Sequence, residues 1–212
     1  TLPICLKALM KRVKTGLLCA AVALALSGCA DSERAAKIIP AQTETKQSSS
    51  YMMTVRQTDY CPHALGGIDG SAYTNSLEAL WRSYEGGARL FEADIHLTSD
   101  KEAVLVHGFA KNDYLKRIGK EYYPEEYMSS GEDYIPTHDE FMQFKIQGKY
   151  HPLDFRMLAD FIREHDDMYV LADTWAQDYN STREVYTAMV EACGKDERAL
   201  SHIIAGGHSK EM

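Results

Sequence analysis

The segment RLFEADIHLTSD, residues 89–100, constrains the fold more than any other part of the sequence. Its apolar residues alternate with Glu92, Asp94 and His96, and successive side chains of a β-strand point to opposite faces of a sheet. The spacing therefore predicts a strand that turns all three polar side chains toward one place. Two carboxylates and an imidazole on one face of an otherwise apolar strand indicate a functional site.

Strand and helix patterns alternate around this segment. Short apolar runs predict further strands at residues 60–63, 103–107, 168–173 and 202–206. Capping-box pairs predict that helices begin at Asn75 (with Glu78), Thr137 (with Glu140) and Ser181 (with Glu184), and residues 152–165 have helical spacing. Helices between strands favour parallel pairing and an α/β fold. Residues 108–135 are expected to form an irregular insertion that faces the substrate or acts as a lid.

The N-terminal region has the pattern of an export signal. Lys11, Arg12 and Lys14 precede the apolar run 16–26, which is too short to cross a bilayer core of about 30 Å. The following LSGC, residues 26–29, resembles the lipobox of bacterial lipoproteins, and Cys29 is then the residue that carries the lipid. A plain signal peptide or a short buried helix is the alternative.

These patterns predict four regions along the chain. Residues 1–9 are expected to be upstream sequence, 10–28 a lipoprotein signal peptide, 29–50 the lipidated cysteine with a polar tether, and 51–212 the folded domain. The mature protein would then lie outside the cytoplasm, anchored to the bacterial cell membrane by its lipid. Cys61 and Cys193 fall in the folded domain, where they form a disulfide or stay as two separate thiols.

The charge balance excludes one class of partner. The 212 residues carry a net charge of −8, which argues against nucleic-acid binding because that function needs basic patches for the phosphates. The same charge repels any anionic substrate at long range. Such a substrate would need a local positive charge or a metal ion at the site.

Titratable residues fall at the ends of the predicted strands, where parallel α/β enzymes place their sites. Glu92, Asp94 and Asp173 bring three carboxylates that would repel one another unless a cation neutralises them, and oxygen ligands suit Ca²⁺ or Mg²⁺. His63 and His107 can then act as general base and general acid near neutral pH. A divalent metal with two imidazoles suits phosphodiester cleavage.

The same residues resemble a known family. The stretch HALGGIDGSAYTNSLEALWRSYEGGARLFEADIHLTSDKEAVLVH, residues 63–107, resembles the start of a glycerophosphodiester phosphodiesterase domain, and the later IPTHDEF and YVLADT match its layout up to Asp173. The resemblance covers roughly residues 59–212. It implies a (β/α)₈ barrel of the phosphatidylinositol-phospholipase-C-like group, truncated at its C-terminus with about five of eight strands present. Residues 51–212 are then the N-terminal part of the barrel.

The resemblance also implies a function, and the sequence departs from the family pattern at three positions. The implied function is that of a Ca²⁺- or Mg²⁺-dependent hydrolase that cleaves small or lipid-derived glycerophosphodiesters to an alcohol and glycerol 3-phosphate. The family's usual Arg after the first His is here Ala64, its usual Lys is Trp175, and Gly108 replaces the Asp that commonly follows the second His. His96 is expected to contact the phosphate, and Trp175 to stack on a sugar or lipid group of the substrate. The alternatives are a non-catalytic lipoprotein that uses the barrel to bind a ligand, and a phospholipase C-like enzyme that forms a cyclic phosphate.

Overall fold

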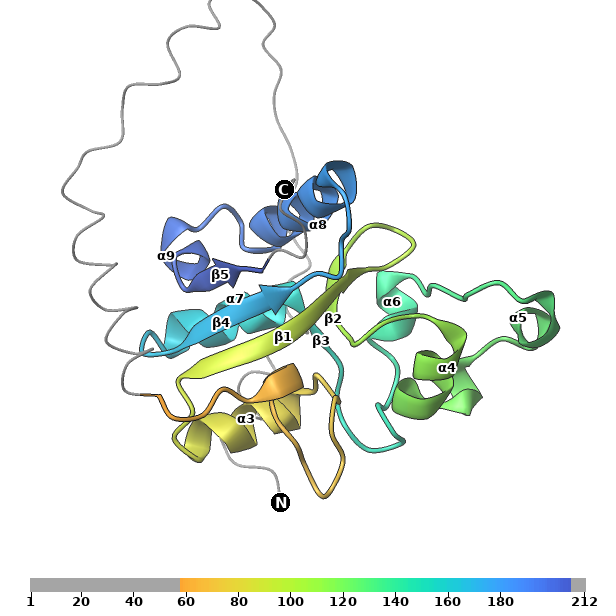
Figure 1. Cartoon of the computed structure of the whole chain (residues 1–212), viewed down its shortest axis with the longest axis horizontal. Coiled ribbons are helices and arrows are strands. Elements are labelled where there is room, and N and C mark those ends of the chain that lie inside the picture. Colours follow the sequence, from red (N-terminus) through yellow and green to blue (C-terminus); the bar gives the residue numbers. More distant parts are fainter. Residues whose placement is uncertain (1–57, 207–212) are drawn as a thin grey trace, which may run out of the picture. The chain divides into compact units, whose positions relative to one another are not determined.

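The computed structural model describes residues 58–206, which form a mixed α/β domain on a five-stranded sheet (Figure 1). The sheet order is β3-β2-β1-β4-β5, with bounds β1 Leu90–Leu97, β2 Ala103–Leu105, β3 Leu153–Asp154, β4 Tyr169–Asp173 and β5 Ile203–Ala205. None of the helices within residues 58–206 is long and apolar enough to cross a membrane. The expected signal peptide, Cys29 and tether all lie outside the described residues.

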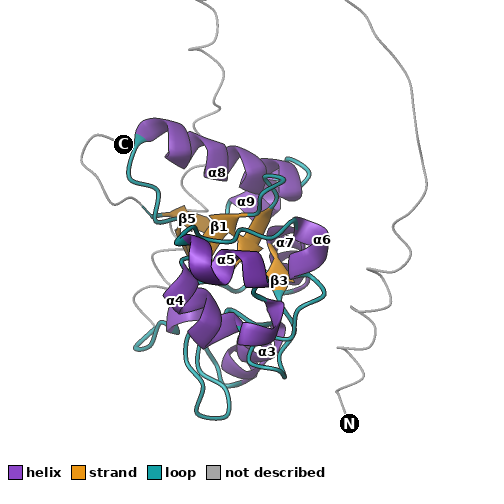
Figure 2. Cartoon of the chain, turned by 90° about the vertical axis from the view of Figure 1, so that its right-hand side faces the viewer, coloured by secondary structure: helices purple, strands orange, loops and turns teal. Residues whose placement is uncertain are grey.

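One half of the sheet has the parallel β/α order predicted from the sequence. Strand β1 pairs in parallel with β4, and β4 with β5. Helix α7 (Phe155–Glu164) precedes β4, and α8 (Tyr179–Ala192) and α9 (Glu197–Leu200) connect β4 to β5. Helix α7 lies behind β4 and β1 in Figure 1, and α8 lies above the strands in Figures 1 and 2. This arrangement is that of part of a (β/α)₈ barrel.

The other half of the sheet, where no helix separates the first two strands, is antiparallel. Strands β1 and β2 form an antiparallel hairpin with Ile95 opposite Leu105, and β3 adds to β2 in antiparallel orientation. The connection at residues 98–102 is a tight turn, in which the Lys101 N–H donates to the Thr98 carbonyl oxygen at 2.9 Å. A connection this short allows only a hairpin, because parallel neighbours need a long crossover.

The predicted strand at residues 60–63 was wrong. Pro62 is extended and accepts a 2.9 Å hydrogen bond from the Glu92 N–H, but the chain then turns into the short 3₁₀ helix η1, His63–Leu65. Ala64 and Leu65 have positive φ angles, which a continuing strand does not permit. The segment thus lies beside β1 without joining the sheet as a strand.

Two of the three predicted helix starts were also wrong. Helix α3 (Leu77–Glu85) is capped by Ser76 and not by Asn75, and α8 is capped by Asp178 and not by Ser181. In both cases a second residue of good capping chemistry lies nearby, so spacing alone does not choose between them. The Thr137–Glu140 capping box of α6 (His138–Phe141) is confirmed.

The insertion, residues 108–135, is more regular than expected. It forms α4 (Lys111–Asp113), a π-helical turn η2 (Tyr114–Ile118), a 3₁₀ turn η3 (Lys120–Tyr122) and α5 (Glu125–Ser130), and lies to one side of the sheet (Figure 1). Its aromatic residues are buried against the segment that follows, in a cluster that includes Phe109, Tyr114, Tyr123, Phe141 and Phe144. Tyr114 and Tyr123 are therefore core residues, and the partly buried Tyr122, Tyr127 and Tyr134 pack against the cluster.

Candidate functional site

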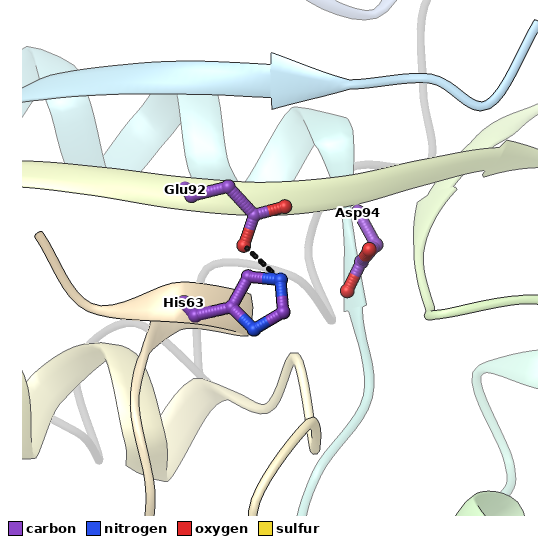
Figure 3. A group of neighbouring side chains, drawn as sticks. All are labelled: His63, Glu92 and Asp94. Atoms are coloured by element: carbon purple, nitrogen blue, oxygen red, sulfur yellow. Dashed lines mark ion pairs between the residues drawn. The ribbon is translucent and has the colours of Figure 1, made fainter.

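His63, Glu92 and Asp94 converge at one place, as Figure 3 shows. One donor atom from each residue lies within 4.8 Å of the other two. Both carboxylates are buried (Glu92 is 8% exposed and Asp94 1%), whereas His63 is exposed. The alternation of β1 aims both acids at this spot, and η1 brings His63 to it from a separate segment.

Glu92 is held by one oxygen and leaves the other without a partner. Its Oε2 accepts a 2.5 Å hydrogen bond from the Ala64 N–H and lies 3.5 Å from Nε2 of His63. Its buried Oε1 has no hydrogen-bond partner among the described residues. Burial raises the pKa of Glu92 to about 7, against the Ala64 hydrogen bond that lowers it, and the nearby Asp94 charge raises it further.

Asp94 is satisfied by a residue that the sequence reasoning had treated only as a helix cap. The Asn75 amide donates to Oδ2 of Asp94 at 2.8 Å, and its carbonyl oxygen accepts from the Asp94 N–H at 3.2 Å. Asn75 is fully buried with φ of +46°, a conformation that asparagine adopts more readily than most residues. The signal that could have found it is an Asn next to a Ser, only one of which can cap the helix.

Asp173 lies beside this group but is not one of its three closest members. Strand pairing sets Asp173 directly opposite Asp94 on the parallel neighbour β4, so both side chains are on the same face of the sheet. The Asp173 carboxylate accepts a 3.3 Å hydrogen bond from the Trp175 N–H. Its charge contributes to the raised pKa of Glu92.

His107 reaches the site because the β1–β2 hairpin folds back on itself. The Val106 N–H donates to the Asp94 carbonyl oxygen at 3.1 Å, which brings the next residue alongside the acidic group. Nδ1 of His107 lies 3.4 Å from Oδ2 of Asp113, a carboxylate of the insertion. The sequence reasoning did not anticipate Asp113, because it belongs to the segment expected to be irregular.

The ring of Tyr73 contacts both candidate catalytic histidines. Its ring lies 4.7 Å from that of His63 and 5.3 Å from that of His107, nearly perpendicular to both. Trp175, 49% exposed, contacts the His107 ring at a centroid distance of 5.6 Å. This contact places Trp175 beside a candidate catalytic histidine, and its stacking on the substrate stays a prediction.

His96 shares the face of Glu92 and Asp94 but is enclosed. Its ring lies beside Gly108 and Phe109, and its Nε2 is buried without a hydrogen-bond partner among the described residues. Burial lowers the pKa of His96, against the opposing effect of the Asp94 charge. A neutral imidazole next to the acidic group follows from this environment.

The chemistry of the group fits a hard divalent cation. Buried carboxylates on one face, one of them with an unpartnered oxygen, are the donors that Ca²⁺ and Mg²⁺ prefer, and a cation would offset their mutual repulsion. The two cysteines of the described region take no part. Cys61 is exposed, Cys193 is buried, and both are free thiols, so the separate-thiol alternative holds and the disulfide does not.

Comparison with solved structures supports the barrel-type fold. The chain is similar to a protein from Silicibacter pomeroyi named as a glycerophosphoryl diester phosphodiesterase, with 15% identity and a TM-score of 0.53, over 74% of this chain and 60% of that one. A phosphodiesterase from Oleispira antarctica, in complex with its product sn-glycerol-3-phosphate, has 16% identity and a TM-score of 0.47 over 69% of this chain and 54% of its own. The chain thus spans less than two thirds of the length of either structure.

Comparison with other sequences gives a family. No curated protein matches the chain. The model of the glycerophosphoryl diester phosphodiesterase family matches residues 67–184, a stretch that contains Asn75, Glu92, Asp94, His107 and Asp173. This match covers more than half of the chain, and the folded site has the acids and imidazoles that the sequence resemblance implied. The chain therefore belongs to the glycerophosphoryl diester phosphodiesterase family.

Proposed function

We propose that this chain carries the site of a metal-dependent phosphodiesterase, which hydrolyses glycerophosphodiesters to an alcohol and glycerol 3-phosphate. The observation that carries the proposal is the convergence of His63, Glu92 and Asp94 within 4.8 Å, with His107 brought alongside by the hairpin. Family membership supports the same reaction class.

The acids are the proposed cation ligands. Glu92 and Asp94, with Asp173 on the adjoining strand, would hold Ca²⁺ or Mg²⁺. When bound, such an ion offsets the negative charge of the phosphoryl oxygens. Asn75 donates one hydrogen bond to the Asp94 carboxylate and accepts another from the Asp94 backbone N–H, so that this ligand is already oriented in the folded chain.

The histidines are the proposed acid and base. One imidazole takes a proton from the attacking water as its oxygen bonds to phosphorus, and the other protonates the leaving alkoxide as the phosphorus–oxygen ester bond breaks. Oδ2 of Asp113, 3.4 Å from Nδ1 of His107, is the proposed group that orients that ring. We also propose that His96 and Trp175 contact the substrate, at the phosphate and at the alcohol half respectively.

The test is product analysis with the chain and Mg²⁺ or Ca²⁺. Phosphorus NMR should show glycerol 3-phosphate released from at least one of several glycerophosphodiesters, and absence of any phosphomonoester would reject the proposal. A cyclic phosphate product would indicate the cyclising alternative. Tight substrate binding without turnover, unchanged in His63→Ala, would indicate a non-catalytic binding protein.

A charge-neutral substitution tests the acidic group directly. Glu92→Gln keeps the shape of the side chain but removes its charge, so hydrolysis should fall by at least about 100-fold while the circular dichroism spectrum is unchanged. Glu85→Gln, at an exposed position of α3, is the matched control and should retain activity. Equal activity of both variants would contradict the role of Glu92.

The lipid anchor is a separate proposal that rests on the sequence of residues 10–29. Acylation of Cys29 would hold the protein at the outer side of the bacterial cell membrane. Metabolic labelling with a fatty acid should mark the chain and should be lost in Cys29→Ser but not in Cys19→Ser. Labelling that survives Cys29→Ser would contradict the anchor.

A further inference from the structure

The carboxylates of the site repel any anionic ligand. Glu92, Asp94 and Asp173 are negative, and so is any phosphodiester or phosphomonoester that binds beside them. The residue after His63 is Ala64, which is fully buried, and the exposed rim residue after β4 is Trp175. Neither position supplies a cation to the substrate.

A guanidinium from the insertion contacts the same tyrosine ring as the two histidines. Cζ of Arg117 lies 4.2 Å from the centre of the Tyr73 ring, and the same ring contacts both His63 and His107. Arg117 is thus separated from each imidazole by a single aromatic ring. No local pattern in the sequence indicates this contact, because Arg117 is 44 positions after Tyr73 and inside the segment expected to be irregular.

Arg117 is held by one atom of its guanidinium. Its Nε donates to Oδ1 of Asp113 at 3.0 Å, while Oδ2 of the same carboxylate faces His107. Its Nη1 and Nη2 groups have no hydrogen-bond partner among residues 58–206. Four N–H donors of a guanidinium, whose side chain is 14% exposed, therefore remain for a ligand.

The local backbone explains why the side chain is fixed there. Arg117 belongs to the π-helical turn η2, whose Tyr114 and Ile118 are buried in the aromatic cluster. π-Helical turns are uncommon and frequently occur at functional sites, because the extra residue redirects a side chain. The cluster and the Tyr73 ring together hold the guanidinium in one orientation.

We propose that Arg117 is the phosphate-binding cation of this site, delivered by the insertion and stacked on Tyr73. The ligand class is a phosphate mono- or diester anion, which a guanidinium fork can bind through two parallel hydrogen bonds. The inference rests on the proposed function in placing this anion between the histidines. Phosphate binding itself requires no turnover, so the two proposals can be tested separately.

The test measures the affinity of the Mg²⁺-loaded chain for inorganic phosphate by calorimetry or phosphorus NMR. Arg117→Gln should weaken binding by about tenfold or more, as expected for loss of a charge-assisted hydrogen-bond pair, and Arg117→Lys should have an intermediate effect. The matched control is Lys116→Gln, which removes the same charge from an exposed position of the same turn and should change the affinity less than about twofold.

A second measurement needs no variant. In the wild-type chain, modification of Arg117 by an arginine-selective dicarbonyl, followed by mass spectrometry, should slow when phosphate is added. Unchanged labelling, equal affinities of Arg117→Gln and Lys116→Gln, or no phosphate binding by the wild-type chain would each overturn the inference. Phosphate binding through Arg117 without hydrolysis of any diester would support the inference and contradict only the proposed function.

Discussion

Asp94 illustrates how single residues stabilise this site. A carboxylate with 1% exposure is stable in a protein interior only when its lone pairs are satisfied. The amide of Asn75 donates a hydrogen bond to Oδ2 of this carboxylate, and its carbonyl oxygen accepts another from the Asp94 backbone N–H. Because the pairing uses both ends of the amide, it also fixes the direction of the carboxylate.

Removal of the Asn75 amide should therefore destabilise the folded domain. Asn75→Ala leaves Oδ2 of Asp94 buried without its donor and places alanine at a positive φ, so the free energy of unfolding should fall by about 2 kcal/mol or more. Urea denaturation measures this free energy. Asn180→Ala, at an exposed position in the first turn of α8, is the control and should stay within about 0.5 kcal/mol of the parent. A comparable stability for both variants would show that the Asn75–Asp94 pair contributes little.

At the scale of the elements, the η1 turn must approach α3 closely to bring His63 to β1. Gly66 ends this turn with φ of +104°, and a Cβ there would overlap Oγ of Ser83. The Ser83 hydroxyl is needed where it is, because it donates to the Leu65 carbonyl oxygen at 2.8 Å. The glycine is thus required by conformation and by space together.

Alanine substitutions at two glycines of similar φ distinguish the cost of backbone strain from the cost of steric overlap. Gly87 has a similar φ of +98°, and no atom lies within 4 Å of the place that a Cβ would take, so Gly87→Ala should cost only the backbone strain of about 1–2 kcal/mol. Gly66→Ala should cost at least about 1 kcal/mol more, because the serine must move and lose its hydrogen bond. In a Ser83→Ala background this extra cost should disappear. If it persists in thermal unfolding, the clash with Ser83 is not its cause.

A histidine–carboxylate pair links α6 to the start of α7 and should make stability depend on pH. Nε2 of His138 lies 3.0 Å from Oδ2 of Asp154, and this hydrogen bond raises the pKa of His138. A raised pKa means that the folded state favours the protonated ring, so the stabilisation is complete below the unfolded pKa of about 6.5 and is lost as pH rises through the folded value.

The variant His138→Gln should therefore be less stable than the parent by about 1 kcal/mol at about pH 5, and closer to it at about pH 9. Urea denaturation at both pH values provides the comparison. A difference that is constant between them, or larger at the alkaline value, would contradict the role of the charged ring.

At the scale of the whole described domain, two separate cores support the site. One core surrounds β1 and β4, whose buried residues include Phe91, Ile95 and Val170, while the aromatic cluster packs the insertion against residues 141–150. The acids come from the first core, and Asp113 and Arg117 come from the second. The site therefore depends on both, even though only the sheet resembles a barrel.

The second core should matter for stability as well as for the site. Phe141 is fully buried between Phe109 and Phe144, and Phe141→Ala should lower the free energy of unfolding by about 3–5 kcal/mol. Tyr179→Ala, at a 64% exposed position, is the control and should change it by less than about 1 kcal/mol. A small effect of Phe141→Ala in urea denaturation would show that the insertion folds independently of this cluster.

The sequence alone determined what local periodicity and chemistry can encode. The two-residue alternation placed Glu92, Asp94 and His96 on one face of β1, and the order of strands and helices predicted the parallel half of the sheet. It also identified His63 and Asp173 as residues near the acids, and His107, whose ring contacts the same tyrosine as His63. These features depend on contacts between neighbours in the chain or on a fold whose strand ends meet at one edge.

Only the tertiary structure decided which side chains contact one another in the site. That Asn75 bonds Asp94, that Asp113 faces His107, and that Arg117 stacks on Tyr73 all depend on segments separated by 6 to 44 positions and on the left-handed turns that bring them together. No local pattern marks such pairs, because the same asparagine could cap a helix and the same arginine could face solvent. Only the packing of the two cores makes one of these choices lower in free energy.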